Sequence, residues 1–214
     1  MSRAPSTRHA RGSEEYSRVL GFTDGIFAFA ITLLVVSISI PEPEPSGVLA
    51  SRADVFGMLR GLWPQIQAFL VSFVIVAYAW LGHHQLMARM EAVDLPFMAW
   101  NLLYLLLIVL LPLMTALIGL YESNPEAVTV YALYFAVLFL VDLIGFRLVW
   151  QRRLLRHGIE DRHLRHGIWA KTLPIGVFLI SIPLVWSVGP GWATASWILI
   201  WPMEAFLDRL IRPA

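Results

Sequence analysis

One acidic residue lies inside an apolar stretch that is long enough to cross a membrane. The stretch runs from residue 18 to residue 40, begins with Arg18 and contains Asp24 and Thr32. An ionisable side chain within a membrane-spanning helix is energetically costly, and it usually marks an ion path, a proton relay or a polar network. Asp24 could therefore bind a cation, carry a proton or anchor its helix, and the polar positions on later apolar segments favour the anchor.

Several polar residues near one end of the apolar segments could pair with Asp24. They are Arg18, Trp80, His83, His84 and Asn101. Under the topology given below, all of them lie close to the same membrane surface. We therefore expect a buried network in which each polar group has a partner.

Two other groups of residues suggest different chemistry. Imidazole binds transition metals, and the chain has an adjacent histidine pair and a histidine-containing connection, with His83, His84, His157, His163 and His166. Membrane metal enzymes need spaced histidine repeats on several segments, so one adjacent pair argues only weakly for such an enzyme. Asp142 lies several residues inside a further apolar run, where it could relay protons or pair with a neighbouring helix. The chain contains no cysteine, which removes thiolate sites and disulfides.

Membrane-spanning helices must position these residues. The chain of 214 residues is 58% hydrophobic and 14% charged, with a mean hydropathy of +0.67. A helix needs about 20 apolar residues to cross the hydrocarbon core. Six runs are long enough, namely 18–40, 62–86, 95–120, 128–150, 168–188 and 191–211. The predicted fold is all-α, a polytopic membrane protein with six transmembrane helices in a single domain, 1–214.

The distribution of arginine sets the expected orientation. Arginines concentrate in the N-terminal segment 1–17, in the fourth connection 151–167 and near the C-terminus, whereas the third and fifth connections carry none. Positive residues favour the cytoplasmic side, so both termini are expected in the cytoplasm. The stretch 41–61 is then an external loop that begins with the helix-terminating sequence PEPEPSG. The first run is too long for a signal peptide and is expected to be retained, and the spread of charge gives no indication of a nucleic-acid partner.

The first span has one distinctive face. At about 100° per residue, one side of the helix carries Phe22, Gly25, Phe29, Thr32, Leu33, Val36 and Ile40. Asp24 falls on the far side, toward the rest of the bundle. Small residues would let neighbouring helices approach closely at Gly21, Gly25, Ala28 and Ala30. The span therefore combines a specialised face with a packed face.

These residues resemble the RxxxFSD signature of the transmembrane protein 175 family, whose members are potassium-permeable channels of lysosomes and bacteria. Arg18, Phe22, Thr23 and Asp24 stand in the four signature positions. The similarity continues through the first three spans with Thr32, Leu33, Leu34, Trp80, His83, Asp94, Asn101, Leu111, Pro112 and Thr115. The later spans match in number and length only.

The resemblance implies a homotetramer of six-helix protomers around four copies of the first helix. It implies pore-facing positions at Phe29, Thr32, Leu33 and Val36, and a pore-helix network of Arg18, Phe22, Thr23, Asp24, Trp80, His83 and Asn101. Two positions differ from the family pattern, because the signature serine is Thr23 and the aliphatic constriction residue is Phe29. A ring of four phenylalanines could close a pore more tightly by dewetting, or face a hydrated ion differently.

The expected function is passive conduction of potassium ions across a bacterial plasma membrane. Hydrophobic rings at Phe29, Leu33 and Val36 would gate the path, and the Thr32 hydroxyls would contact the permeant K+. No cofactor is expected, the protein is not expected to be an enzyme, and its expected partners are further copies of itself and membrane lipid. The alternatives are a proton-coupled transporter or proton leak channel that uses Asp24, His83 or Asp142, and, less favoured, a membrane metal enzyme.

Overall fold

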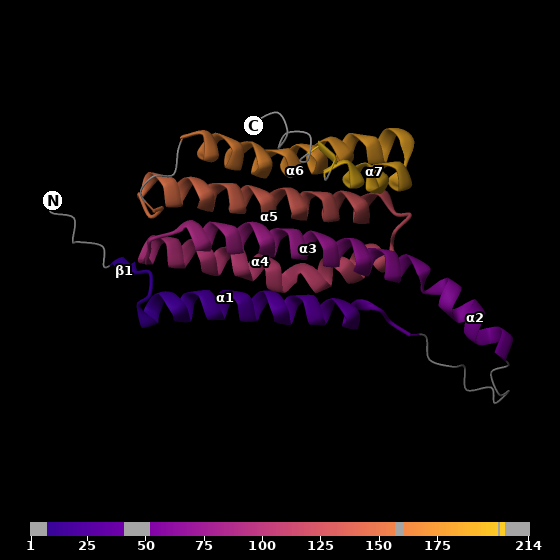
Figure 1. Cartoon of the computed structure of the whole chain (residues 1–214). Helices are drawn as coiled ribbons and strands as arrows, with labels where there is room; N and C mark the ends of the chain where they lie inside the picture. The colour runs from indigo at the N-terminus through magenta and orange to yellow at the C-terminus, as the bar shows by residue number, and fades with distance from the viewer. Residues whose placement is uncertain (1–7, 41–51, 157–160, 201, 204–214) are drawn as a thin grey trace.

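Long helices lie side by side in an elongated bundle (Figure 1). The computed structural model describes residues 8–40, 52–156, 161–200, 202 and 203, with the backbone alone at 52–54 and 161–166. The elements in chain order are β1 Arg8–Ala10, α1 Glu14–Leu33, η1 Leu34–Ser37, α2 Arg52–Gly61, α3 Trp63–Arg89, β2 Ala92–Asp94, α4 Leu95–Leu120, α5 Pro125–Gln151, α6 Asp161–Val188, α7 Pro190–Ser196 and η2 Trp197–Leu199.

Five segments of the described chain are long and apolar enough to cross a membrane. They are Glu14–Ser37, Trp63–Arg89, Leu95–Leu120, Pro125–Gln151 and Gly167–Val188. Each of the first five predicted spans overlaps one of these segments, and the repeated apolar helices support a helical membrane protein. The predicted sixth span, 191–211, begins with α7 and η2, but most of its second half lies outside the described residues. A sixth spanning helix therefore stays a prediction.

The first span is not one continuous α-helix. The α-helix ends at Leu33, continues as the 3₁₀ turn η1, and is followed by extended backbone at Ile38 with φ −85° and ψ 108°. The prediction of helical periodicity as far as Ile40 is therefore wrong beyond Leu33. Two adjacent β-branched valines lower the helix propensity there, and Pro41 disfavours the helical conformation of the residue before it.

Helix α2 lies within the stretch 41–61 that the sequence predicts to be an external loop. The helix extends beyond the bundle at the end remote from β1 (Figure 1). The prolines that terminate helices are confined to the first part of this stretch, and residues 52–61 contain none, so a helix can form again. Leu62 then joins α2 to α3, and Pro64 occupies the first turn of α3, where its missing N–H is not needed.

Polar side chains determine where three helices begin. The caps are Ser13, Asp94 and Asn124, whose side-chain oxygens accept from the backbone N–H of Tyr16, Phe97 and Ala127 at 3.3, 3.1 and 2.9 Å. Each cap satisfies a backbone donor that has no partner within the first turn of its helix. The starting points of α1, α4 and α5 set the depth in the bundle at which their polar residues lie.

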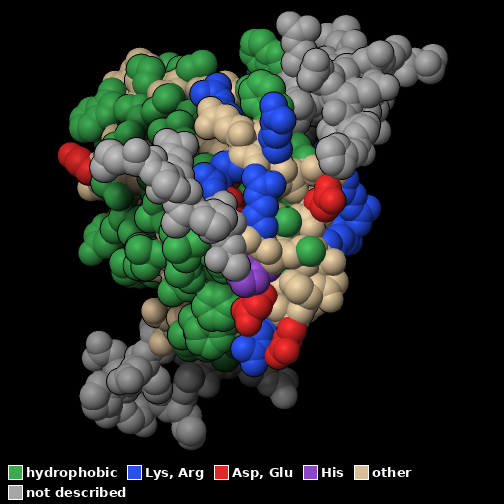
Figure 2. Space-filling view, turned by 90° about the vertical axis from the view of Figure 1, so that its left-hand side faces the viewer, with side chains coloured by type: hydrophobic (Ala, Val, Ile, Leu, Met, Phe, Trp, Pro, Cys, Tyr) green, Lys and Arg blue, Asp and Glu red, His purple; other side chains and the backbone are tan. Residues whose placement is uncertain are grey.

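The N-terminal segment is tied to the end of the bundle where α3 meets α4. Strand β1 pairs antiparallel with β2, with Arg8 opposite Asp94. The Tyr16 hydroxyl donates to the Met87 carbonyl at 2.6 Å, and Arg152 Nε donates to the buried Asp94 carboxylate at 2.5 Å. Figure 2 looks onto this end and shows basic side chains gathered there. The N-terminal segment, the α3–α4 connection and the start of the α5–α6 connection therefore lie at one end of the bundle, which agrees with the grouping expected from the arginine pattern.

Candidate functional site

Three polar side chains form a buried chain of hydrogen bonds that joins α1, α4 and α3. Asn101 Nδ2 donates to Thr23 Oγ1 at 2.8 Å, and the Asn101 carbonyl oxygen lies 2.9 Å from His83 Nε2. Since the amide oxygen can only accept, His83 Nε2 carries the proton and donates. The three side chains are 0%, 2% and 1% exposed for Thr23, Asn101 and His83. At this depth the bonds hold α1 against both neighbouring helices.

Aromatic rings fix the orientation of His83. Its ring stacks on Tyr104 with a centroid distance of 5.5 Å and an interplanar angle of 8°, and on Trp100 at 6.1 Å and 11°. Phe27 of α1 approaches the same imidazole at 6.0 Å. Stacked rings restrict rotation about the side-chain bonds, so Nε2 stays directed at Asn101.

Gly145 on α5 makes room for this stack. A methyl group placed on Gly145 would overlap the six-membered ring of Trp100. The Trp100 indole also donates to the Val141 carbonyl at 2.8 Å. The ring therefore lies directly against the α5 backbone, and the stack that orients His83 is braced by α5.

Asp24 makes a second, separate tie from α1 to α3. Trp80 Nε1 donates to Asp24 Oδ1 at 2.9 Å, in a partly buried position. The Trp80 ring lies 5.2 Å from the His84 ring. The structure thus brings Asp24 together with Trp80, and Thr23 with Asn101 and His83. Five of the seven residues of the expected pore-helix network are thus joined in two hydrogen-bonded groups.

Arg18 does not reach Asp24 within the chain. It pairs with Glu14 at 3.3 Å, and the two side chains are 70% and 82% exposed. Residues three or four apart face each other on a helix, whereas Arg18 and Asp24 are six apart and point in different directions. The expectation that Arg18 satisfies Asp24 inside one protomer is therefore corrected, and Phe22 of the same signature is also exposed, at 52%.

The other side of α1 is uncovered. The predicted pore-facing residues Phe29 and Val36 are 56% and 70% exposed, Thr32 is exposed and Leu33 is partly buried. The buried residues are Tyr16, Thr23, Phe27, Ala30 and Leu34. The division into a packed face and a free face follows the helical wheel, although Val36 belongs to the 3₁₀ turn. The Thr32 hydroxyl donates to the Phe29 carbonyl at 2.8 Å.

A buried ion pair lies between α5 and α6. Lys171 Nζ donates to Asp142 Oδ2 at 2.5 Å, with side-chain exposures of 13% and 6%. The ammonium group also lies 5.9 Å from the centre of the Phe146 ring. The sequence left a relay or a packing pair open for Asp142, and the observed contact is a pair. The sequence analysis did not identify Lys171 as the partner of Asp142. Lys171 is the one lysine of the sequence and lies in an apolar span, which could have indicated a buried partner.

Three hydroxyl groups form another cluster that hydropathy does not show. Ser72 Oγ lies 2.8 Å from the Tyr131 hydroxyl, and Thr115 Oγ1 lies 2.7 Å from Ser72 Oγ. All three residues are at least 98% buried. The cluster links α3, α4 and α5 in the half of the bundle remote from β1.

The histidines raised the less favoured alternative of a metal enzyme. Among the residues with described side chains, no three His, Asp, Glu or Cys groups come together to hold a metal ion. His83 uses Nε2 for Asn101, and His84 is exposed beside Trp80. The side chains of His157, His163 and His166 lie outside the described part of the chain.

Comparison with known proteins leads to the same part of the chain. The sequence model of a family described as the endosomal/lysosomal potassium channel TMEM175 matches residues 18–112. A protein of Chamaesiphon minutus that is named a potassium channel is 35% identical over 137 residues. Residues 18–112 of this chain are therefore similar to the TMEM175 family. The matched residues contain most of α1, all of α3 and most of α4, and they include both polar ties of α1.

The alignments with the curated relatives cover part of each protein. The Chamaesiphon alignment spans 64% of this chain and 65% of the relative. A protein of Streptomyces collinus, also named a potassium channel, is 32% identical over 136 residues, which is 64% of this chain and 63% of the relative. In both cases the aligned part is less than two thirds of the relative's length.

Solved structures extend the similarity to the whole fold. The crystal structure of a lysosomal potassium-selective channel TMEM175 homologue from Chamaesiphon minutus matches with a TM-score of 0.73 and 25% identity, over 94% of this chain and 100% of that chain. A variant of the potassium channel MtTMEM175, solved with a nanobody fusion protein, matches with a TM-score of 0.65 and 16% identity, over 98% and 97%. Because the identity to MtTMEM175 is low, this second match shows only that the fold is shared.

Proposed function

We propose that this chain belongs to the TMEM175 family and is a potassium-permeable cation channel of a bacterial plasma membrane, with both termini in the cytoplasm. Four copies of the chain would surround a central path, each contributing the uncovered face of α1. Phe29, Leu33 and Val36 would form hydrophobic rings, and Thr32 would form a layer of oxygen ligands for K+. The observation that supports this proposal best is the combination of a free face and a polar anchored face on the same helix.

The anchored face is informative because α1 lies at the edge of the bundle (Figure 1). A helix that only separates the bundle from lipid needs no buried polar contacts, since apolar packing suffices. Thr23 and Asp24 instead form hydrogen bonds to two different helices. Such bonds fix the rotation of α1, and a fixed rotation matters when the opposite face has a function.

Two glycines on the free side support contact with a second copy. A methyl group placed on Gly21 or Gly25 would meet nothing within 4 Å. Glycine within a helix costs about 0.5–1 kcal/mol relative to alanine, and packing inside this chain gives no reason for it. Small residues allow close approach of helices in membranes, so a neighbouring protomer against α1 would explain both positions.

The geometry of Thr32 suits a cation ligand. Its hydroxyl hydrogen is directed to the Phe29 carbonyl of the same helix, at an oxygen distance of 2.8 Å. The remaining lone pairs of the oxygen are then free on the uncovered side. Four such oxygens around an axis would replace part of the water around K+, and selectivity should be modest compared with rings of backbone carbonyls.

The reversal potential of the purified full-length protein tests the proposal. Planar bilayers would separate potassium on one side from sodium on the other, and we expect a shift toward the potassium equilibrium potential. Thr32→Ala should lower the K+/Na+ permeability ratio about fivefold if the hydroxyl layer contributes about 1 kcal/mol to the preference. Thr172→Ala is the matched control, because Thr172 is an exposed threonine of α6 that also donates to its own helix.

Two results would contradict the proposal. An unchanged ratio in Thr32→Ala would remove this hydroxyl from the mechanism. An absence of current together with flux that follows an imposed pH gradient would favour the proton-coupled alternative, and would direct attention to His83, Asp24 and Asp142 as proton carriers.

A further inference from the structure

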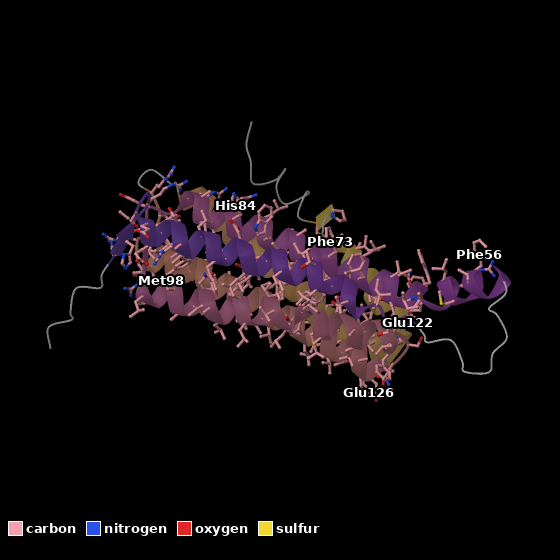
Figure 3. The ribbon with its side chains drawn as sticks, turned by 90° about the horizontal axis from the view of Figure 1, so that it is seen from below. Phe56, Phe73, His84, Met98, Glu122 and Glu126 are labelled. Carbon is pink, nitrogen blue, oxygen red and sulfur yellow. The ribbon has the colours of Figure 1, made fainter. Side chains whose placement is uncertain are left out.

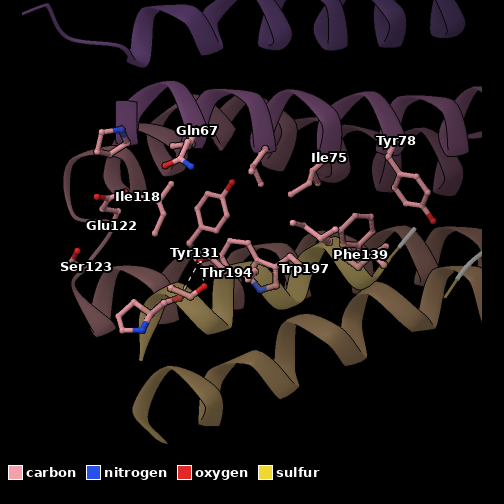
Figure 4. Close-up of a pocket in the computed structure, with 18 residues that line it drawn as sticks. Gln67, Ile75, Tyr78, Ile118, Glu122, Ser123, Tyr131, Phe139, Thr194 and Trp197 are labelled. Atoms are coloured by element: carbon pink, nitrogen blue, oxygen red, sulfur yellow. Dashed lines mark hydrogen bonds between the residues drawn. The ribbon is translucent and has the colours of Figure 1, made fainter. Parts of the chain in front are cut away.

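A cavity of about 600 Å³ lies between α3, α4, α5 and α7. None of the described residues that line it belongs to α1, so it is separate from the proposed ion path. Its volume falls within the range of about 300–1,000 Å³ that is usual for small-molecule sites. Figure 4 shows it from the side, with Glu122 toward one end and Tyr78 and Phe139 toward the other.

The cavity is elongated along α3. Pro64 and Tyr78 both line it and stand fourteen residues apart on α3, which corresponds to about 21 Å along the helix axis. The hydrocarbon core of a bilayer is about 30 Å thick, so the length of the cavity corresponds to more than half of that thickness. This shape suits one extended alkyl chain better than a rounded ring system.

The lining has a polar end and an apolar body. Val71, Ile75, Ile118 and Phe139 contribute to the apolar wall. At the other end, Glu122 is exposed in the α4–α5 connection, and it is the one charged residue among the described residues of the lining. A cationic head near Glu122 and an apolar tail along α3 would match this distribution.

We propose that the cavity binds an alkylammonium amphiphile, with its primary ammonium group at Glu122 and its alkyl chain along α3 toward Tyr78. The same chemistry is available from a membrane lipid with an ethanolamine head group and from a free long-chain amine. The negative charge at the mouth of the cavity favours an ammonium head over a carboxylate or a phosphate without an amine. Binding at this site is independent of conduction through α1.

Photolabelling of the full-length protein tests this site. The protein would be placed in nanodiscs of phosphatidylcholine and phosphatidylglycerol, and irradiated with a diazirine-bearing dodecylamine or with the matched diazirine-bearing dodecanol. Mass spectrometry should locate the amine adducts on residues 64–78 and 190–200. Competition by phosphatidylethanolamine would identify the lipid as the source, and competition by soluble dodecylamine alone would identify a free amine.

Three variants make the test specific. Glu122→Gln should weaken labelling by the amine about two- to fivefold, the range for a partly solvated ion pair, and leave labelling by the alcohol unchanged. Glu126→Gln is the control, because Glu126 is exposed at the same end of the bundle and does not line the cavity (Figure 3). Ala195→Phe, at an exposed position of α7 that lines the cavity, should reduce labelling by both probes.

The proposal is overturned by either of two results. Adducts spread evenly over all lipid-facing helices would show that the cavity is not a preferred site. Equal labelling by amine and alcohol, with no effect of Glu122→Gln, would show that the carboxylate does not recognise the head group. Val71→Phe on α3 provides a second way to fill the cavity if Ala195→Phe alters the elution of the protein on size exclusion.

Discussion

Replacing Asn101 by leucine tests whether the polar network holds α1 in place. The substitution conserves approximate size and removes the side chain that links Thr23 to His83, at 2.8 and 2.9 Å. Both partners stay behind in the bundle, 0% and 1% exposed, without their hydrogen bonds. We therefore expect Asn101→Leu to lower the free energy of unfolding in a membrane mimetic.

Measurements on soluble proteins and on a membrane protein give different values for the expected loss of stability. In water-soluble proteins, each buried polar group left without a partner costs about 1–3 kcal/mol, which predicts about 2–6 kcal/mol for two groups. Interhelical hydrogen bonds measured in a membrane protein average about 0.6 kcal/mol and reach about 1.7 kcal/mol, because the unfolded state also finds partners. The second scale applies to a helix bundle in lipid. We therefore expect a loss of about 1–3 kcal/mol.

Reversible denaturation in bicelles, followed by circular dichroism, measures this loss. Gln85→Leu is the control, since Gln85 is an exposed polar residue of the same helix as His83 and should change stability by less than about 0.5 kcal/mol. Thr23→Val removes the hydroxyl of the same chain of bonds, so the double variant with Asn101→Leu should lose less than the sum of the two single variants. Additive losses, or an Asn101→Leu protein as stable as the control, would refute the network as an anchor.

Three further predictions concern other parts of the bundle. Lys171→Met leaves a buried carboxylate unpaired and should lower the free energy of unfolding by about 3–5 kcal/mol in the same denaturation assay. The double variant with Asp142→Leu should regain most of this stability. Equal losses of stability in the single and the double variant would count against the ion pair. Gly145→Ala should cost about 1–3 kcal/mol because its methyl group would overlap a neighbouring indole ring, while Gly176→Ala, in open space on α6, should be neutral or stabilising. Phe29→Ala should raise the basal potassium current severalfold in planar bilayers, because it removes a phenyl ring from the proposed constriction on the free face of α1. An unchanged current would place the constriction elsewhere.

The spans could be predicted because hydropathy depends on local sequence. Long apolar runs locate five helices, and the arginine pattern groups the connections that the structure brings to one end of the bundle. The free face of α1 could also be predicted, because side chains on an α-helix repeat at a fixed angle. The prediction failed where that regularity ends, at the 3₁₀ turn after Leu33.

The partners of buried polar residues were harder to predict. Trp80 was among the candidates for Asp24, and the resemblance to the family brought Thr23, His83 and Asn101 together. Lys171 was not found as the partner of Asp142, because hydropathy does not tell which helices are neighbours. The cavity near Glu122 could not be predicted for the same reason, since its volume depends on how the side chains of four helices pack.

The rotation of α1 is controlled by two consecutive residues. Thr23 accepts a hydrogen bond from Asn101 on α4, and Asp24 accepts one from Trp80 on α3. Consecutive side chains on a helix diverge by about 100°, so these two bonds point in different directions from the same turn. A rotation of α1 in either direction lengthens at least one of them. Phe29, less than two turns further along, is therefore held on the free face by residues that do not touch it, and loss of either bond should disturb the face without altering its side chains.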